Sequence, residues 1–141
     1  MKTQDRNEMI EKIGQCASFI LGSVDENGYP NAKAMMKVEH DGLETFYFST
    51  YTSAIRTIQY MKNPKACIYC FAEKETVFGL MLKGEMEVLT DAAAKKRFWV
   101  EDWKIYYPQG PADPDYCILK FIAKSGIYNC GEKKLMFDIC R

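Results

Sequence analysis

The chain has little of several features that mark common functional classes. It contains a single histidine, His40, and its 19 basic and 19 acidic residues leave no net charge. No apolar run approaches the roughly 20 residues that a helix needs to cross a bilayer, and residues 1–8 are too polar for a signal peptide. Balanced charge provides no overall field that favours nucleic acid or an anionic membrane. We therefore expect a cytoplasmic protein that binds neither.

The single histidine and the positions of the cysteines argue against a Ser/His/Asp catalytic set and against a metal site. His40 falls in an expected turn, where residues lie at the surface, so no Ser/His/Asp set can be assigned. The six cysteines are expected to be reduced thiols in the cytoplasm. Cys67 and Cys70 have a spacing seen in metal sites, but they fall in an expected strand, where side chains three positions apart point to opposite faces. We therefore predict no metal site.

What the sequence does contain is a regular alternation of turns and apolar runs. Glycine adopts positive φ at little cost, so the segments 25–28 and 40–42, which end in Gly28 and Gly42, predict tight turns. The runs beside them predict three consecutive antiparallel strands at residues 16–24, 31–38 and 43–49. With 141 residues, of which 48% are hydrophobic, the chain is predicted to form a single domain over residues 1–141.

Residues that favour an anion occur around the second and third of these strands. Lys33 and Thr50 are predicted to lie on neighbouring strands. Ile55, Ile58 and Met61 share one face of a helix that Thr52 or Ser53 caps and that Asn63-Pro64 ends. Arg56 lies in the first turn of this helix, where free N–H groups and the helix dipole suit a phosphate. Taken singly, such cations usually lie in solvent, so it is their joint placement that predicts a phosphate site.

Five motifs connect this pattern to a known family. They are Asp25-Glu26-Asn27-Gly28-Tyr29-Pro30, Lys33-Ala34-Met35, Phe46-Tyr47-Phe48-Ser49-Thr50, Ser53-Ala54-Ile55-Arg56 with Asn63-Pro64, and the run from Tyr106 to Tyr116. In their order and spacing the chain resembles the flavin-binding split-barrel proteins related to pyridoxamine 5'-phosphate oxidase, in particular the general-stress-protein branch. The resemblance covers about residues 16–130.

The resemblance implies a fold, a cofactor and a set of site residues. The fold is mainly β, a six-stranded antiparallel split barrel with a few α-helices, and it forms a homodimer with FMN at each subunit interface. Lys33, Ser49, Thr50, Ser53 and Arg56 would surround the phosphate of FMN, and Ala34, Met35 and Met36 would run beside the flavin ring. Trp103, Tyr106 and Tyr107 are candidates for the wall of the flavin or substrate cavity, although ordinary core and dimer packing also explains aromatic residues there.

The implied activity is that of an FMN-dependent oxidoreductase, which acts on an unidentified small molecule by hydride transfer at flavin N5. NAD(P)H is a candidate electron donor, and no catalytic side chain is assigned, because a flavin carries the redox chemistry itself. The chain lacks the C-terminal Arg/His segment of the true oxidases, and Gly79 stands where they often have a flavin-contacting glutamine. Two alternatives stay open: a non-catalytic module that stores or senses flavin, and a split barrel that holds another cofactor such as haem.

The remaining elements follow from caps, breakers and periodicity. Asp5 and Glu8 match a capping box for a helix that ends near Gly14 and plugs one end of the barrel. Trp99 and Trp103 are one helical turn apart and are expected to share a face. We further predict a strand at residues 76–89 bent at Gly79 or Gly84, a helix at 92–99 capped by Asp91, a strand at 116–130 and a short strand at 135–139.

Overall fold

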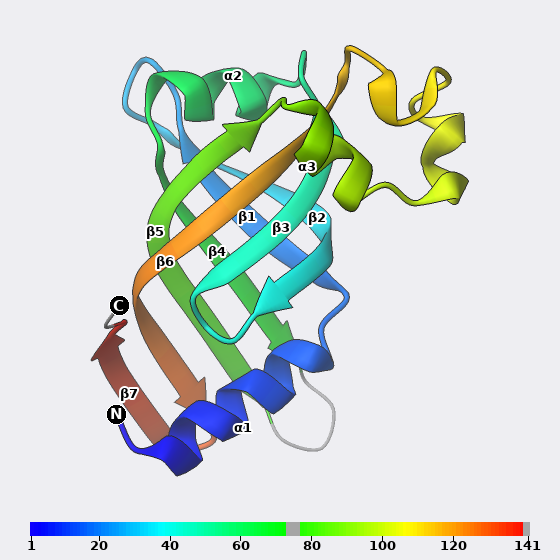
Figure 1. Cartoon of the computed structure of the whole chain (residues 1–141). Coiled ribbons are helices and arrows are strands. Elements are labelled where there is room, and N and C mark those ends of the chain that lie inside the picture. The colour runs from blue at the N-terminus through cyan, green and yellow to red at the C-terminus, as the bar shows by residue number, and fades with distance from the viewer. Residues whose placement is uncertain (73–76, 140–141) are drawn as a thin grey trace.

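Six antiparallel strands form a closed barrel in the computed structural model of the protein, which describes residues 1–72 and 77–139 (Figure 1). They are β1 (Ser18–Val24), β2 (Pro30–Asp41), β3 (Thr45–Tyr51), β4 (Lys65–Ala72), β5 (Phe78–Leu89) and β6 (Tyr116–Cys130). The strand order is β3-β2-β1-β4-β5-β6, and pairing of β3 with β6 closes the barrel. A further strand, β7 (Lys133–Asp138), extends from β6. The predicted split-barrel fold is confirmed.

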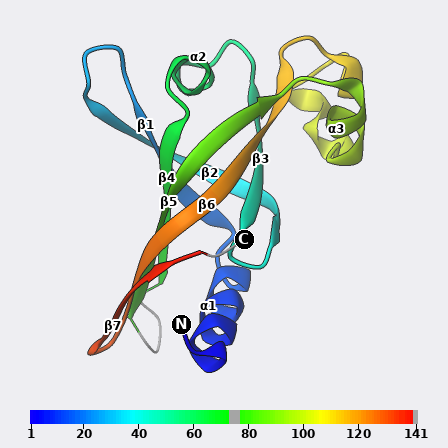
Figure 2. The same ribbon diagram turned by 60° about the vertical axis from the view of Figure 1, so that its left-hand side comes forward.

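Helices cover the two ends of the barrel. The helix α1 (Thr3–Gly14) lies at one end, and α2 (Ile55–Lys62) and α3 (Ala92–Arg97) lie at the other, as both views show (Figure 1, Figure 2). The short 3-10 helices η1 (Glu101–Ile105) and η2 (Gly110–Ala112) follow α3. Met9 and Ile13 of α1 are fully buried in the main core. The prediction that this helix plugs the barrel is therefore confirmed.

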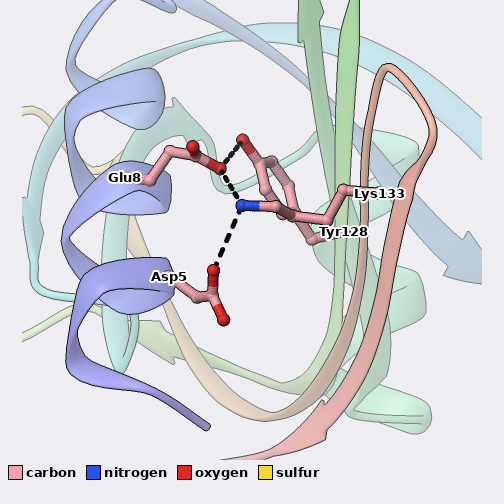
Figure 3. Close-up of polar contacts among 4 residues, drawn as sticks. All are labelled: Asp5, Glu8, Tyr128 and Lys133. Atoms are coloured by element: carbon pink, nitrogen blue, oxygen red, sulfur yellow. Dashed lines mark hydrogen bonds and ion pairs between the residues drawn. The ribbon is translucent and has the colours of Figure 1, made fainter.

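The predicted capping box of α1 is wrong. Lys2 occupies the N-cap position, and no side chain caps the helix. Instead, the hydroxyl of Tyr128 on β6 donates to Glu8 Oε2 at 2.8 Å, and Lys133 Nζ on β7 lies 3.2 Å from Asp5 Oδ1 and 3.4 Å from Glu8 Oε2 (Figure 3). The two carboxylates therefore bind the helix to the sheet rather than to its own backbone.

The predicted turns are present, and the strand after the first of them is longer than expected. Gly28 and Gly42 have φ of 85° and 56°. The Asp25 carboxylate accepts the N–H groups of Asn27 and Tyr29, and the hydrogen bond from Tyr29 is the main cause of its lowered pKa. Because β2 continues to Asp41, His40 lies in a strand, half-buried and stacked on Phe46 at 5.6 Å. Its predicted position in an exposed turn is wrong.

Close packing explains where the long strand β5 bends. The β5–β6 register shifts between Lys83 and Gly84, and a Cβ at Gly84 would meet the backbone oxygen of Ile122. The bend is therefore at Gly84 rather than at Gly79. The strand begins at Phe78 in the described residues, and position 76 of the predicted strand lies outside them.

The helix α2 forms as predicted, but Ala54 occupies its N-cap position rather than Thr52 or Ser53. The apolar residues that share one face of it are exposed, with Ile55 at 76% and Met61 at 55%. Its buried residues are Thr57 and Tyr60, whose hydroxyls donate to Tyr51 O at 2.7 Å and Gly22 O at 3.0 Å. Hydrogen bonds to the ends of β3 and β1 thus decide which face of α2 packs on the barrel.

The cysteine pair of β4 behaves as the strand periodicity predicts. Cys70 is 1% exposed in the barrel core, whereas Cys67 is half-buried beside Gly22. Among the described residues, no group of three or more His, Cys, Asp or Glu side chains is placed to hold a metal ion. Within residues 1–72 and 77–139, no helix is long and apolar enough to span a membrane.

Candidate functional site

The barrel opens where β2 separates from β3. The registered pairs of these strands run from Asp41↔Thr45 only as far as Lys37↔Phe48. Beyond that point β2 pairs with β1, whereas the end of β3 pairs with β6. Lys37 N–H donates to Ala17 O on the β1 side. The backbone N–H and C=O groups of successive residues point to opposite sides of a strand. The backbone groups of Met36 and Ala34 therefore face the opening, away from β1.

A cavity of about 380 Å³ occupies this opening, and we call it the Lys33 cavity. All of the predicted site residues except Thr50 and Ser53 line this cavity. Its lining residues are Lys33, Ala34, Met35, Met36, Ser49, Arg56, Trp103, Tyr106 and Tyr107, together with Lys37, Val38 and Val100. The two predicted cations and one of the three predicted hydroxyl residues, Ser49, therefore share one cavity with the predicted aromatic wall.

Arg56, which lines this cavity, has a buried donor that makes no hydrogen bond among the described residues. Its Nη2 donates to the hydroxyl of Thr50 at 2.6 Å, and Thr50 is only 2% exposed. The Nε of Arg56 is buried and has no hydrogen-bond partner among the described residues. A buried donor without an acceptor is unfavourable, and a guanidinium group is well suited to bind an oxyanion. The donor set therefore fits the phosphate of a cofactor.

Tyr107 lies deep in the same cavity and is 4% exposed. Burial raises the pKa of Tyr107 to about 12, although a hydrogen bond with Ser49 opposes this shift. The phenol is therefore neutral at physiological pH and keeps its proton available as a hydrogen-bond donor. Tyr106 is 56% exposed and lies nearer solvent.

The two tryptophans meet in a way that the sequence did not predict. Their rings are 6.0 Å apart and edge to face, but α3 ends at Arg97 and Trp103 belongs to η1. The predicted helix at 92–99 therefore ends two residues early and the two rings do not share the face of one helix, although Asp91 does cap α3 by accepting Ala94 N–H at 3.0 Å. The chain between the two helices brings the rings into contact, and Trp103 lines the Lys33 cavity.

Ser53 and Thr50 stand apart from the other predicted ligands. Thr50 contacts the site through Arg56. Ser53 gives both of its donors to Asp115: its N–H binds Oδ1 at 2.8 Å and its hydroxyl binds Oδ2 at 3.0 Å. Asp115 was missed by the sequence analysis, because it is 62 positions from Ser53 and no local pattern relates them.

Gly79 lines a different cavity, of about 250 Å³, with Tyr69 and Phe71 among its walls. A Cβ at Gly79 would meet the hydroxyl of Tyr69, so the glycine makes room for that ring. Within one chain, Gly79 is therefore not part of the Lys33 cavity, and its predicted place at the flavin edge stays a prediction.

A larger hollow lies on the outer surface of the sheet. It has a volume of about 710 Å³ and crosses β2, β1, β4, β5 and the middle of β6. Its walls are mainly apolar and include Ile20, Val24 and Ala66, with the charged Lys65 and Glu85 also among the lining residues. We call this hollow the apolar groove. The exposed side chains of Tyr69, Phe71 and Met36 lie on the same strands.

Comparisons with known proteins agree with this architecture. The model of the family described as pyridoxamine 5'-phosphate oxidase like matches residues 4–139. No curated protein matches the chain. A solved structure from Clostridium acetobutylicum, of a protein related to general stress protein 26 of B. subtilis (pyridoxinephosphate oxidase family), is 39% identical. The alignment covers 99% of this chain and 97% of that one, with a TM-score of 0.86.

Two more distant structures share the fold. General stress protein 26 from Bacillus anthracis str. Sterne is 21% identical, with 92% of this chain and 97% of that one covered and a TM-score of 0.72. A NimC/NimA family protein from Clostridium acetobutylicum is also 21% identical, with 96% and 94% covered and a TM-score of 0.70.

Proposed function

Because this chain belongs to the pyridoxamine 5'-phosphate oxidase-like family, we propose that it is an FMN-binding flavoprotein and an oxidoreductase that acts on a small molecule. The observation that carries the proposal is that Arg56, whose buried Nε has no hydrogen-bond partner among the described residues, lines one cavity with Lys33 and Ser49. This family commonly binds flavin, and the Lys33 cavity offers cations and hydroxyls for a phosphate beside apolar walls for a ring.

The phosphate end of the proposed site is built from β2, β3 and α2. Arg56 supplies its guanidinium group, and Lys33 supplies a second positive charge from the exposed half of β2. The hydrogen bond to Thr50 holds Nη2 in place, so it also fixes the orientation of the planar guanidinium group. Hydrogen bonds to charged groups contribute on the order of 1.5–3 kcal/mol each.

The ring end is formed by the backbone of β2 and the aromatic wall. The outward-facing backbone groups of Ala34 and Met36 offer hydrogen bonds along one edge of a planar ligand, while Trp103 and Tyr106 offer apolar surface. Bound FMN would supply hydride transfer at its N5, and NAD(P)H is the proposed donor. The chain's own contribution is to hold and orient the ring and to limit the access of water.

We also propose that two copies of the chain form a homodimer with the Lys33 cavity at their interface. Met36 is 70% exposed and Tyr106 is 56% exposed, although both line this cavity, so one wall of the site is open in the single chain. The apolar groove lies on the same sheet surface, and large exposed apolar patches are typical of interfaces. A partner seated there would cover the open wall.

Purification of the untagged protein tests the cofactor and the activity separately. Mass spectrometry of small molecules released by denaturation should find FMN, and the native protein should have the visible absorbance of a flavin. Addition of NADH or NADPH under anaerobic conditions should bleach that absorbance. Release of no flavin, together with no uptake of added FMN, would refute the proposal.

The alternatives predict different results in the same experiment. Bound FMN that neither NADH nor NADPH bleaches would favour a flavin store or sensor. A haem would give its own visible bands, but His40 is poorly placed as a ligand, because its Nδ1 lies 3.0 Å from Gly42 O and its ring stacks on Phe46.

A further inference from the structure

Asp115 holds the loop that joins β3 to α2. The last registered pair of β3 and β6 is Tyr51↔Tyr116, so Asp115 lies directly beyond the paired strands. Its carboxylate accepts the N–H and the hydroxyl of Ser53 at 2.8 and 3.0 Å, and its backbone oxygen accepts Thr52 N–H at 2.9 Å. Three hydrogen bonds thus fix two successive residues of the loop.

This loop determines where Arg56 points. Ala54 is the N-cap of α2 and Arg56 is the second residue of the helix, so the loop sets the position from which the Arg56 side chain extends. From that position Arg56 Nη2 reaches the hydroxyl of Thr50 at 2.6 Å. A loop free to move would leave Arg56 free to turn toward solvent.

Asp115 is itself held in place by buried neighbours. The carboxylate of Asp113, which is 5% exposed, accepts Asp115 N–H at 3.0 Å and Gln109 N–H at 3.1 Å. The backbone oxygen of Asp113 accepts the ammonium group of Lys95, 8% exposed, at 2.9 Å. The hydrogen bonds that hold the loop therefore extend through Asp113 to Lys95 on α3.

We propose that Asp115 is a positioning residue of the phosphate subsite, and that Ser53 acts through Asp115 rather than by donating to the phosphate. This inference rests on the proposed binding of FMN. A carboxylate near a phosphate is unfavourable unless other donors satisfy it, and Ser53 satisfies both oxygens of Asp115. Ser53 in turn has no donor left for a ligand while this pair is intact.

The test compares FMN with riboflavin, which lacks the phosphate. Dissociation constants are measured by flavin fluorescence for the wild type, D115A, S53A and the double variant. D115A should weaken FMN binding about tenfold, or about 1.4 kcal/mol, and leave riboflavin binding within about twofold. The double variant should bind FMN as D115A does. D25A is the matched control, because the Asp25 carboxylate also accepts backbone N–H groups in a loop but lies outside the Lys33 cavity.

A second measurement needs no flavin, so it still tests the role of Asp115 if D115A folds too poorly to bind a flavin. D115N keeps one acceptor oxygen, and in both variants hydrogen exchange at the Ser53 amide of the unliganded protein should be faster than in the wild type and in D25A. Unchanged exchange would overturn the role of Asp115 in holding the loop.

The binding outcomes separate the possible errors. A further loss of FMN affinity when S53A is added to D115A would show that Ser53 binds the phosphate directly. Equal weakening of FMN and riboflavin by D115A would show a general structural role instead. Either result overturns the proposal, as does unchanged FMN binding by D115A. A wild type that binds neither flavin would refute the proposed function itself, and this inference with it.

Discussion

Replacement of Arg56 by alanine should separate the binding of FMN from the stability of the fold. Among the described residues, the guanidinium group makes one hydrogen bond, to Thr50 at 2.6 Å, and its Nε has no partner. Loss of this bond, whose donor is charged, costs the fold about 1.5–3 kcal/mol, and removal of the unpartnered Nε offsets part of that cost. We therefore expect R56A to fold normally, with a small decrease in the free energy of unfolding.

The effect on FMN should be larger. Two charge-assisted hydrogen bonds from Arg56 to the phosphate would contribute about 3–6 kcal/mol in total. Partial exposure of the side chain reduces this value through solvent screening. We take the lower end, about 3 kcal/mol, which corresponds to a dissociation constant raised about 100-fold. Riboflavin has no phosphate, so its dissociation constant should change little.

Isothermal titration of the flavin-free protein measures both ligands. R56K retains the positive charge but lacks Nε, so its affinity for FMN should lie between those of the wild type and R56A. R97A is a matched control, because Arg97 pairs with Glu39 on the surface, outside the Lys33 cavity. FMN binding by R56A as tight as that of the wild type would refute the assignment of the phosphate site.

Three further predictions concern the fold and its titration. Y128F should lower the free energy of unfolding by about 1 kcal/mol, measured in urea, because the bond from this buried hydroxyl to Glu8 is lost (Figure 3); an unchanged midpoint would contradict it. G84A should destabilise the barrel by about 1–3 kcal/mol, because the new Cβ would meet the backbone of Ile122, so wild-type thermal stability would be the opposing result. Burial raises the pKa of Tyr107 to about 12, so the contribution of its neutral phenol to the free energy of unfolding is fully present below pH 10 and is lost between pH 10 and 12. Over that interval Y107F should lose less stability than the wild type. Identical dependence of stability on pH in the two proteins would contradict this prediction.

Local chemistry explains the parts of the fold that the sequence predicted well. The turns at Gly28 and Gly42 need positive φ, which is a property of the residues at those positions. The cap of α3 by Asp91 and the full length of β6 are likewise local. The joint placement of Lys33 and Arg56 was predicted because short connections make successive strands neighbours, and one cavity does contain both.

Predictions failed where a residue had a choice of partners. Glu8 matched a cap for its own helix, but Tyr128 and Lys133 offer it hydrogen bonds from the sheet. Ile55 and Met61 matched the apolar face of a packed helix, yet the hydroxyls of Thr57 and Tyr60 bind the strand ends and turn that face outward. Competing partners distant in the chain cannot be ranked from local spacing.

The sequence by itself determined the succession of strands along the chain, the turns at Gly28 and Gly42 and the residue types available for an anion, because backbone conformation and short connections depend on neighbours in the chain. Only the tertiary structure decided which of those residues meet. Closure of β3 on β6 brings Asp115 to Ser53, and the split between β2 and β3 leaves a cavity that Arg56 and Lys33 both line. Contacts of this kind depend on the packing of segments far apart in the chain, and packing is a property of the whole barrel.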